Sequence, residues 1–143
     1  MDDLRVNYLV KEGKLRRRDV DKKRIASLIQ SSIETANYVE EMALKNESAT
    51  VIFRELYECL RQIGDALWWK NGYEVMGSHE ISLEILQNVD VKDKVNLHKL
   101  DWFRRTRNNI NYRGYKTSIE EAKEIVNFWK LIGKDLINTV KIS

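Results

Sequence analysis

The sequence contains no proline and a single cysteine, and each scarcity excludes a class of structure. One cysteine cannot form a disulfide within the chain, so Cys59 is expected to pack as a small apolar residue. Without proline, and with only 6 glycines, few positions oppose helix formation. No apolar run approaches the roughly 20 residues of a membrane-spanning helix, and the start, Met-Asp-Asp-Leu-Arg, does not resemble a signal peptide. We therefore expect a cytoplasmic protein that makes no membrane contact.

The length and composition favour one soluble domain. The chain has 143 residues, of which 43% are hydrophobic and 33% charged, so a domain over residues 1–143 is expected, with residues 1–16 as an N-terminal extension. The net charge is only +3, but basic residues gather in residues 14–24 and again in residues 104–116. These two basic runs would attract phosphate if they met in space. Alternatively, each is a solvated face of a helix.

Apolar residues recur with a helical period along most of the chain, which predicts an all-α fold. Four to five main helices, joined by short loops, favour an up-and-down bundle with a short extra helix at the N-terminus. No stretch alternates as a strand does, and residues 73–77 are expected to form a loop. The expected helices span residues 2–11, 19–44, 48–70, 78–86, 95–112 and 117–140.

Caps and glycines set the details of these helices. Asp19, Ser48 and Ser78 are the expected N-caps, and the last helix should open with a capping box from either Thr117 with Glu120 or Ser118 with Glu121. The helix over residues 48–70 carries two adjacent apolar stripes, as a central helix does, and Gly64 within them predicts a close approach to a neighbour. The glycines after residues 12, 71 and 113 should end helices in left-handed geometry.

Residues 100–115 hold the densest cluster of functional side chains. On a helix of about 3.6 residues per turn, Leu100, Phe103 and Ile110 share one face, and Arg107 falls in the middle of that apolar stripe. An arginine placed there needs a partner, because an unpaired buried charge is costly. The structural alternative is an ordinary helix arginine paired with Asp101. The edge of the stripe should carry Asp101, Arg104, Asn108, Asn111 and Tyr112, and the opposite face Trp102, Thr106, Asn109 and Arg113.

Two segments together resemble the HEPN domain family. In residues 67–86, a helix closes at Gly72-Tyr73 and His79 opens the next helix, as at the junction of the second and third helices in that family. The pattern Asp101-x-x-Arg104-x-x-Arg107-Asn108, followed by Tyr112, resembles the signature helix of the family. The resemblance covers about residues 20–141, with the helices in the same order.

The resemblance implies an all-α homodimer whose signature helices meet near the dimer axis. Many members of the family are metal-independent RNA endonucleases of toxin or defence type, which need no cofactor. By resemblance, Arg107 is the motif arginine and Asn108 its polar neighbour. The resemblance also implies residues that support the motif or bind the substrate: Asp101, Arg104, Arg105 and Asn111. The motif histidine would fall at Tyr112, so this chain departs from the pattern there.

That departure leaves three alternatives. Tyrosine titrates near pH 10 and histidine near about 6.5, so Tyr112 is suited to donating a proton or binding phosphate and poorly suited to acting as a base. The protein is then a degenerate ribonuclease that acts on RNA or nucleotides. Alternatively, it is a non-catalytic partner of a minimal nucleotidyltransferase, with Tyr112 or Tyr115 open to modification, or the cluster only locks a dimer. His79 and His98 lack the spacing of metal ligands, so no metal is expected.

Overall fold

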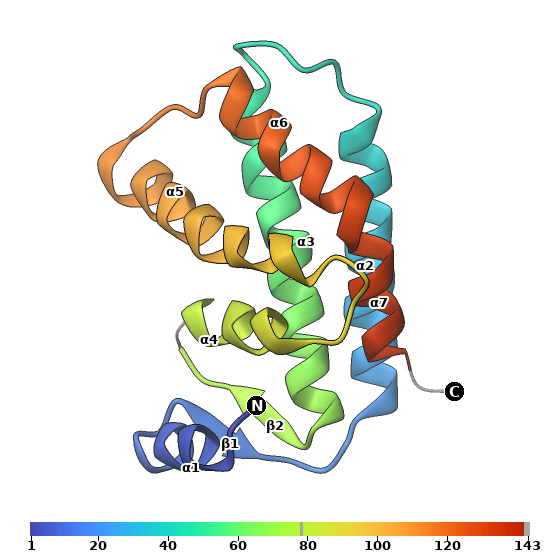
Figure 1. Ribbon diagram of the computed structural model, residues 1–143, viewed down its shortest axis with the longest axis vertical. Coiled ribbons are helices and arrows are strands. Elements are labelled where there is room, and N and C mark those ends of the chain that lie inside the picture. The colour runs from blue at the N-terminus through green and yellow to red at the C-terminus, as the bar shows by residue number, and fades with distance from the viewer. Residues whose placement is uncertain (78, 142–143) are drawn as a thin grey trace.

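The computed structural model describes residues 1–77 and 79–141, and nearly all of its regular structure is helical (Figure 1). The all-α prediction is confirmed. Among the described helices, none has both the length and the apolarity needed to cross a membrane. The expected N-cap Ser78 lies outside the described residues. The helices are α1 Asp3–Lys11, α2 Lys22–Glu40, α3 Ala49–Lys70, α4 His79–Glu84, α5 Lys99–Arg113, α6 Ile119–Phe128 and α7 Lys134–Val140.

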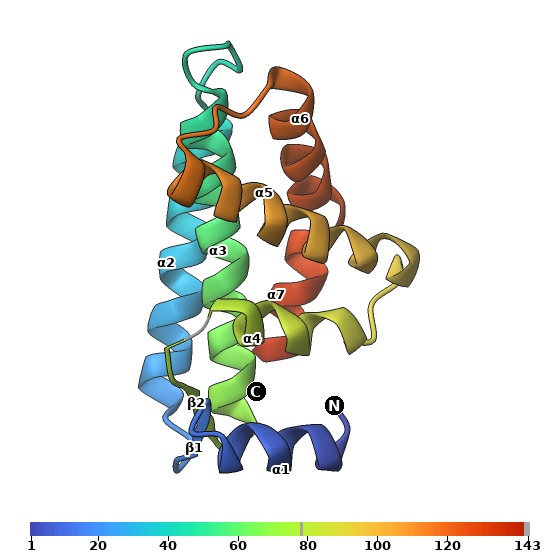
Figure 2. The same cartoon turned by 90° about the vertical axis from the view of Figure 1, so that its left-hand side faces the viewer.

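Helix α3 is the centre of the bundle. Helix α2 packs along it, α6 and α7 pack on another side, and α4 and α5 cross it on the side that faces the viewer in Figure 2. Its two apolar stripes are buried, as the sequence predicted, because neighbours cover α3 from several directions. Cys59 lies in this core with no exposed surface, and burial raises the pKa of its thiol to about 12.

Gly64 allows α4 to pack directly on the backbone of α3. A Cβ atom on residue 64 would lie 1.8 Å from the carbonyl oxygen of Ser82 and 2.6 Å from its carbonyl carbon. Trp68, one turn further along α3, donates from Nε1 to the carbonyl oxygen of Ile81 at 2.7 Å. The predicted close approach at Gly64 is therefore confirmed, and it fixes the position of α4.

The helix ends follow the predicted chemistry, with shifts of a few residues. Asp21, and not the expected Asp19, caps α2 by accepting from the backbone N–H of Arg24 at 3.0 Å, and α2 ends at Glu40 instead of residue 44. Both aspartates suit an N-cap, so sequence alone could not choose between them. Of the two capping boxes, Ser118 with Glu121 is the one formed. Gly114 ends α5 with a φ of +64°, as expected.

A two-stranded antiparallel sheet replaces the loop predicted for residues 73–77. Strand β1, Leu15–Arg17, pairs with β2, Tyr73–Val75, in a register that places Arg16 opposite Glu74. Strands of three residues are too short to show alternation, so no sequence pattern predicted them. The sheet ties α1 to the end of α3, and Val6, Leu9 and Leu15 join the hydrophobic core. The expected extension over residues 1–16 thus shares the core of the bundle.

Three short helical segments that are not α-helical also differ from expectation. A 3₁₀ segment, η2 Lys94–His98, precedes α5, which therefore begins at Lys99 and not at residue 95. A π-helical segment, η3 Trp129–Gly133, separates α6 from α7 within what the sequence predicted as one continuous α-helix. A 3₁₀ turn, η1 Ile85–Asn88, extends α4.

Candidate anion-binding site on α3 and α5

Helix α5 is held against the bundle by an aromatic trio. Phe103 is fully buried and lies edge-on to Phe53 of α3 and Phe128 of α6, with ring centroids 6.0 Å and 5.2 Å away. Lys99, at the start of α5, also pairs with Glu124 of α6 at 3.1 Å. These contacts place one side of α5 against α3 near Phe53, where the two helices cross.

The buried face of α5 is rotated slightly from the predicted one. Thr106 is only 4% exposed, so its predicted place on the far face was wrong. The reason is geometric: residues four apart on a helix lie about 40° apart, so Thr106 neighbours Ile110. Leu100, Phe103, Thr106 and Ile110 form the buried face, and Arg107, which lies between Leu100 and Phe103 around the helix, is half-buried.

Arg107 finds partners that carry no negative charge. Its guanidinium carbon lies 5.5 Å from the ring centroid of Tyr57, a cation–π contact. With its amide oxygen turned toward the guanidinium, Asn111 accepts from Nη1 at 2.9 Å and from Nη2 at 3.1 Å. Within residues 1–77 and 79–141, no carboxylate forms an ion pair with Arg107. The guanidinium is thus positioned by neutral groups, and no paired carboxylate offsets its positive charge.

Asp101 neutralises the neighbouring arginines instead. Its carboxylate lies 3.0 Å from Nη2 of Arg104 and 3.4 Å from Nε of Arg105. Arg104 also reaches Glu80 of α4 at 2.9 Å, which ties α4 to α5. A cavity of about 160 Å³ lies between these helices, and its wall carries Arg104 together with the carboxylates of Glu80, Glu84 and Asp101. The predicted pairing of a helix arginine with Asp101 therefore applies to Arg104 and Arg105, and not to Arg107.

Tyr57 is the member of this site that the sequence did not identify. It is 1% exposed, and Arg107, Arg104 and Arg61 surround it closely enough to affect its titration. Burial raises the pKa of its phenol to about 12, although the three guanidinium groups act to lower it. The phenol is therefore neutral at physiological pH. The only sequence signal was a tyrosine within an apolar stripe, since its hydroxyl needs a polar neighbour when the ring is buried.

Arg61 is held in a network of its own beside Tyr57. It donates to both carboxylate oxygens of Glu58 and, from Nη1, to Asp65 at 2.9 Å. Ser82 of α4 donates its hydroxyl to the other oxygen of Asp65 at 2.5 Å. Arg61 is thus committed to α3 and to the α3–α4 contact, which leaves Arg107 as the guanidinium with no carboxylate partner in the described part of this cluster.

The structure separates Tyr112 from Arg107. Five residues on a helix correspond to about 140° of rotation, and Tyr112 is 79% exposed. The phenol beside Arg107 is instead that of Tyr57, and the side chain that accepts hydrogen bonds from Arg107 is Asn111. Asn108 is half-buried, and Tyr115 donates its hydroxyl to Glu121 at 2.6 Å.

Comparison with family models, with curated proteins and with solved structures found no match. The resemblance to the HEPN family therefore stays a prediction. In the part of the chain that the structure describes, no three histidine, cysteine or acidic side chains are grouped so that they could hold a metal ion.

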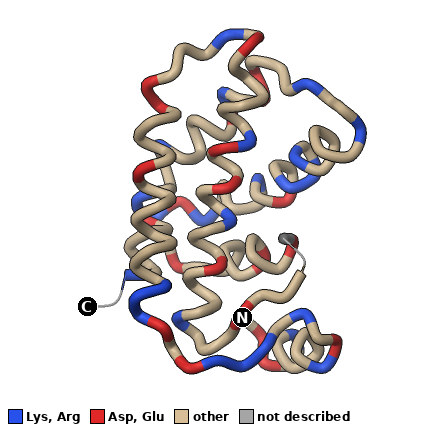
Figure 3. Tube along the Cα trace, turned by 180° about the vertical axis from the view of Figure 1, so that it is seen from behind, with Lys and Arg blue, Asp and Glu red and all other residues tan. Residues whose placement is uncertain are grey.

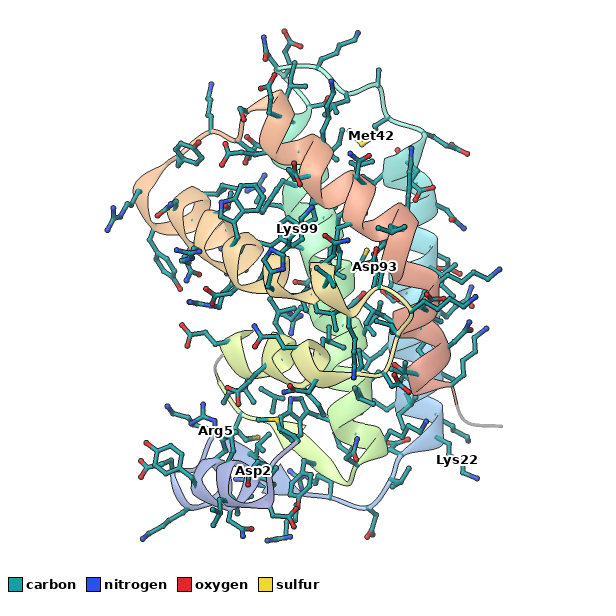
Figure 4. The ribbon with its side chains drawn as sticks, viewed as in Figure 1. Asp2, Arg5, Lys22, Met42, Asp93 and Lys99 are labelled. Atoms are coloured by element: carbon teal, nitrogen blue, oxygen red, sulfur yellow. The ribbon has the colours of Figure 1, made fainter. Side chains whose placement is uncertain are left out.

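The two basic runs do not form one surface. Figure 3 shows them along α5 and along β1 with the start of α2, and Figure 2 shows α4 between these regions. In the first run, Arg18 pairs with Glu74 at 2.9 Å, and the guanidinium carbon of Arg24 lies 4.6 Å from the ring centroid of Trp69. Figure 4 shows Arg5 rising from α1 toward α4, where it pairs with Glu84 at 2.8 Å. The charge around Arg107 therefore stands apart from the N-terminal basic run.

The raised pKa of Tyr57 predicts a loss of stability at alkaline pH. The folded protein binds the phenol proton of Tyr57 more tightly than the unfolded chain does. The stability that this difference contributes is complete below pH 10 and is lost as the pH rises toward 12. The difference in unfolding free energy between wild type and Tyr57→Phe should change by on the order of 2 kcal/mol across that window. Urea unfolding of both proteins at several pH values measures it. A pH-independent difference would contradict the buried neutral phenol.

Proposed function

We propose that the protein binds RNA through the face of α5 around Arg107, as a HEPN-like homodimer. The observation that supports this most is the environment of Arg107, which an aromatic ring and an amide hold in place without a carboxylate. A guanidinium so placed has N–H donors left over for a phosphate, which it can bind through two parallel hydrogen bonds. Unlike Arg104 and Arg105, it has no negative charge to release before an anion binds.

The surroundings of Arg107 extend this positive region. Arg113 and Lys116 are exposed near the end of α5 and form no ion pair with any described residue. Asn108, half-buried beside Arg107, offers an amide that can position a phosphate or a base. A backbone crossing α5 would meet successive cations, which gives salt-dependent affinity without strong sequence preference.

The chemistry available at the site favours binding over fast cleavage. Attack of an RNA 2′-hydroxyl on the adjacent phosphate needs a group that accepts a proton near neutral pH. Tyr112 stands where the HEPN pattern has its histidine, and tyrosine is a weaker general base than histidine. We infer that metal-independent cleavage of the toxin or defence type is slow. Tyr112, turned about 140° from Arg107 around α5, would donate a proton to, or bind, a different phosphate of the same RNA.

Replacing Arg107 with alanine is expected to weaken binding of a single-stranded RNA about tenfold or more, because a charge-assisted bidentate contact is lost. Arg107→Lys should restore only part of the affinity, since an ammonium cannot form the paired hydrogen bonds. The matched control is Arg105→Ala, which removes a cation two residues away that Asp101 already neutralises. Fluorescence anisotropy over a range of salt concentrations measures affinity and the number of phosphate contacts.

Equal RNA affinity in wild type and Arg107→Ala would end the proposal, as would an equal loss in Arg105→Ala. RNA cleavage is followed in the same samples. Cleavage that persists unchanged in Arg107→Ala would be assigned to a contaminant and not to this site.

A second function is favoured by the exposure of Tyr112. In a non-catalytic partner of a minimal nucleotidyltransferase, its phenol oxygen would attack the α-phosphate of a nucleoside triphosphate, and pyrophosphate would leave. The 79% exposure of Tyr112 makes its hydroxyl accessible, whereas the hydroxyl of Tyr115 is bound to Glu121. Adenylate mass on Tyr112, absent in Tyr112→Phe, would favour this function over RNA binding.

A further inference from the structure

Two adjoining cavities follow α2 where it passes the C-terminal helices. They measure about 440 and 410 Å³, share Ile33 and Lys141, and together form one open trough, here called the α2–α7 groove. Both α2 and α7 pack on α3, which lies beneath them. Figure 1 shows α2 and α7 on the opposite side of the bundle from α5, so this groove is separate from the site around Arg107.

The groove has an apolar floor and a basic rim. Ile25, Ile29 and Ile33 of α2 line one cavity, and Ile33 also lines the other, together with Trp129 and Ile137. Four lysines line it, and Glu40 is the one carboxylate among the lining residues; these lysines form no ion pair within residues 1–77 and 79–141. Figure 4 shows Lys22 at the start of α2. The lysines are Lys22, Lys130, Lys134 and Lys141.

The π-helical segment η3 forms part of the groove wall. Trp129, its first residue, is 8% exposed and lies against the backbone of Gly133, where a Cβ atom would approach the indole ring to 2.9 Å. A single π-helical turn is rare and is found frequently at functional sites. Here it sets Trp129 and Lys130 at the groove, where a binding partner would contact both.

The spacing of the rim lysines suits a helical occupant. Lys130 lies in η3, Lys134 begins α7 and Lys141 directly follows its last residue, so the three lysines span about 16 Å, the length of an α-helix of about 11 residues. Carboxylates along one edge of such a helix would meet the lysines in turn, while its apolar face covered Ile33 and Trp129. The rim holds lysines and no arginine, and the floor is mostly aliphatic, so it lacks the bidentate donors and stacking surfaces that single-stranded RNA prefers.

We propose that the α2–α7 groove binds an acidic amphipathic helix of a partner protein, with the partner's apolar face on Ile33 and Trp129 and its carboxylates opposite Lys130, Lys134 and Lys141. Opposite charges across the rim set the direction of the partner helix and speed its association. The proposal does not depend on RNA binding, because the two sites share no residue.

The full chain is tested with a labelled synthetic helix of about 14 residues that carries leucine on one face and glutamate beside it. A second peptide with lysine in place of each glutamate is the matched probe. The acidic peptide should bind saturably and shift the methyl signals of Ile33 and Ile137, whereas the basic peptide should not. Lys134→Glu should weaken binding at least about tenfold, because it removes an attraction and adds a repulsion. Lys123→Glu, on the exposed side of α6 and outside the groove, should leave it unchanged.

Equal binding of the acidic and basic peptides would overturn the proposal, and so would the absence of saturable binding by the acidic peptide. An unchanged affinity in Lys134→Glu, or signal shifts confined to α5, would overturn it as well. RNA affinity is measured on the same variants. Loss of RNA binding in Lys134→Glu would assign the groove to nucleic acid, whereas a loss confined to Arg107→Ala would leave both proposals standing and distinct.

Discussion

Replacing Gly64 with alanine should lower the free energy of unfolding by at least about 3 kcal/mol, because the added methyl overlaps backbone and not a movable side chain. The new Cβ would lie 1.8 Å from the carbonyl oxygen of Ser82, so α4 must move away from α3. Movement of α4 breaks the hydrogen bond from Trp68 to Ile81 and the one from Ser82 to Asp65. The roughly 1 kcal/mol that alanine gains over glycine in a helix is too small to compensate.

Urea unfolding followed by circular dichroism measures this loss. Ser27→Ala, at an exposed position of α2, is the matched control and should change the free energy of unfolding by less than about 0.5 kcal/mol. A Gly64→Ala protein within about 1 kcal/mol of wild type would show that α4 can shift without cost. The variant should also weaken the Arg104–Glu80 ion pair, since α4 carries Glu80.

The helices could be predicted from sequence because apolar residues recur at each turn of the buried face. Gly64 was identified as a close approach for the same reason, since it lies within one of two adjacent apolar stripes on one helix. The β1–β2 pair had no such pattern, because each strand has only three residues. The paired residues Arg17 and Tyr73 are also 56 residues apart in the sequence. Pairing over that distance depends on the finished fold.

The candidate site could be predicted only in the part that lies on one helix. The stretch around Arg107 was visible because its charged residues stand at helical spacing, and Asn111 falls four residues from Arg107. Tyr57 was not visible, because α3 brings it to α5 only through the packing of Phe53 on Phe103. The pairs of Asp101 with Arg104 and Arg105 are also local, at helical spacing within α5, whereas the second carboxylate partner of Arg104, Glu80, comes from α4. Sequence spacing thus identifies the candidate residues on α5, and tertiary contacts add the partners from other helices.

Replacing Phe103 with alanine is expected to cost about 4 kcal/mol of unfolding free energy, since it leaves a cavity among three helices. Phe103 is fully buried, and its ring lies 5.2 Å from Phe128 and 6.0 Å from Phe53, at angles of 81° and 74°. Edge-to-face pairs add to the burial term, so the loss should exceed that of an isolated aliphatic truncation. Thermal and urea unfolding measure it.

The same substitution tests whether the position of α5 creates the site. Arg107 lies one turn beyond Phe103, and its contact with Tyr57 requires α5 to stay close to α3. Phe103→Ala should therefore weaken RNA binding even at temperatures where the protein remains folded, whereas Phe103→Leu, which fills most of the space, should cost about 1 kcal/mol and keep the affinity. An alanine variant that is destabilised but binds RNA as wild type does would show that Arg107 acts without the support of Tyr57. Anion binding at α5 would then depend on the exposed charge of the helix alone.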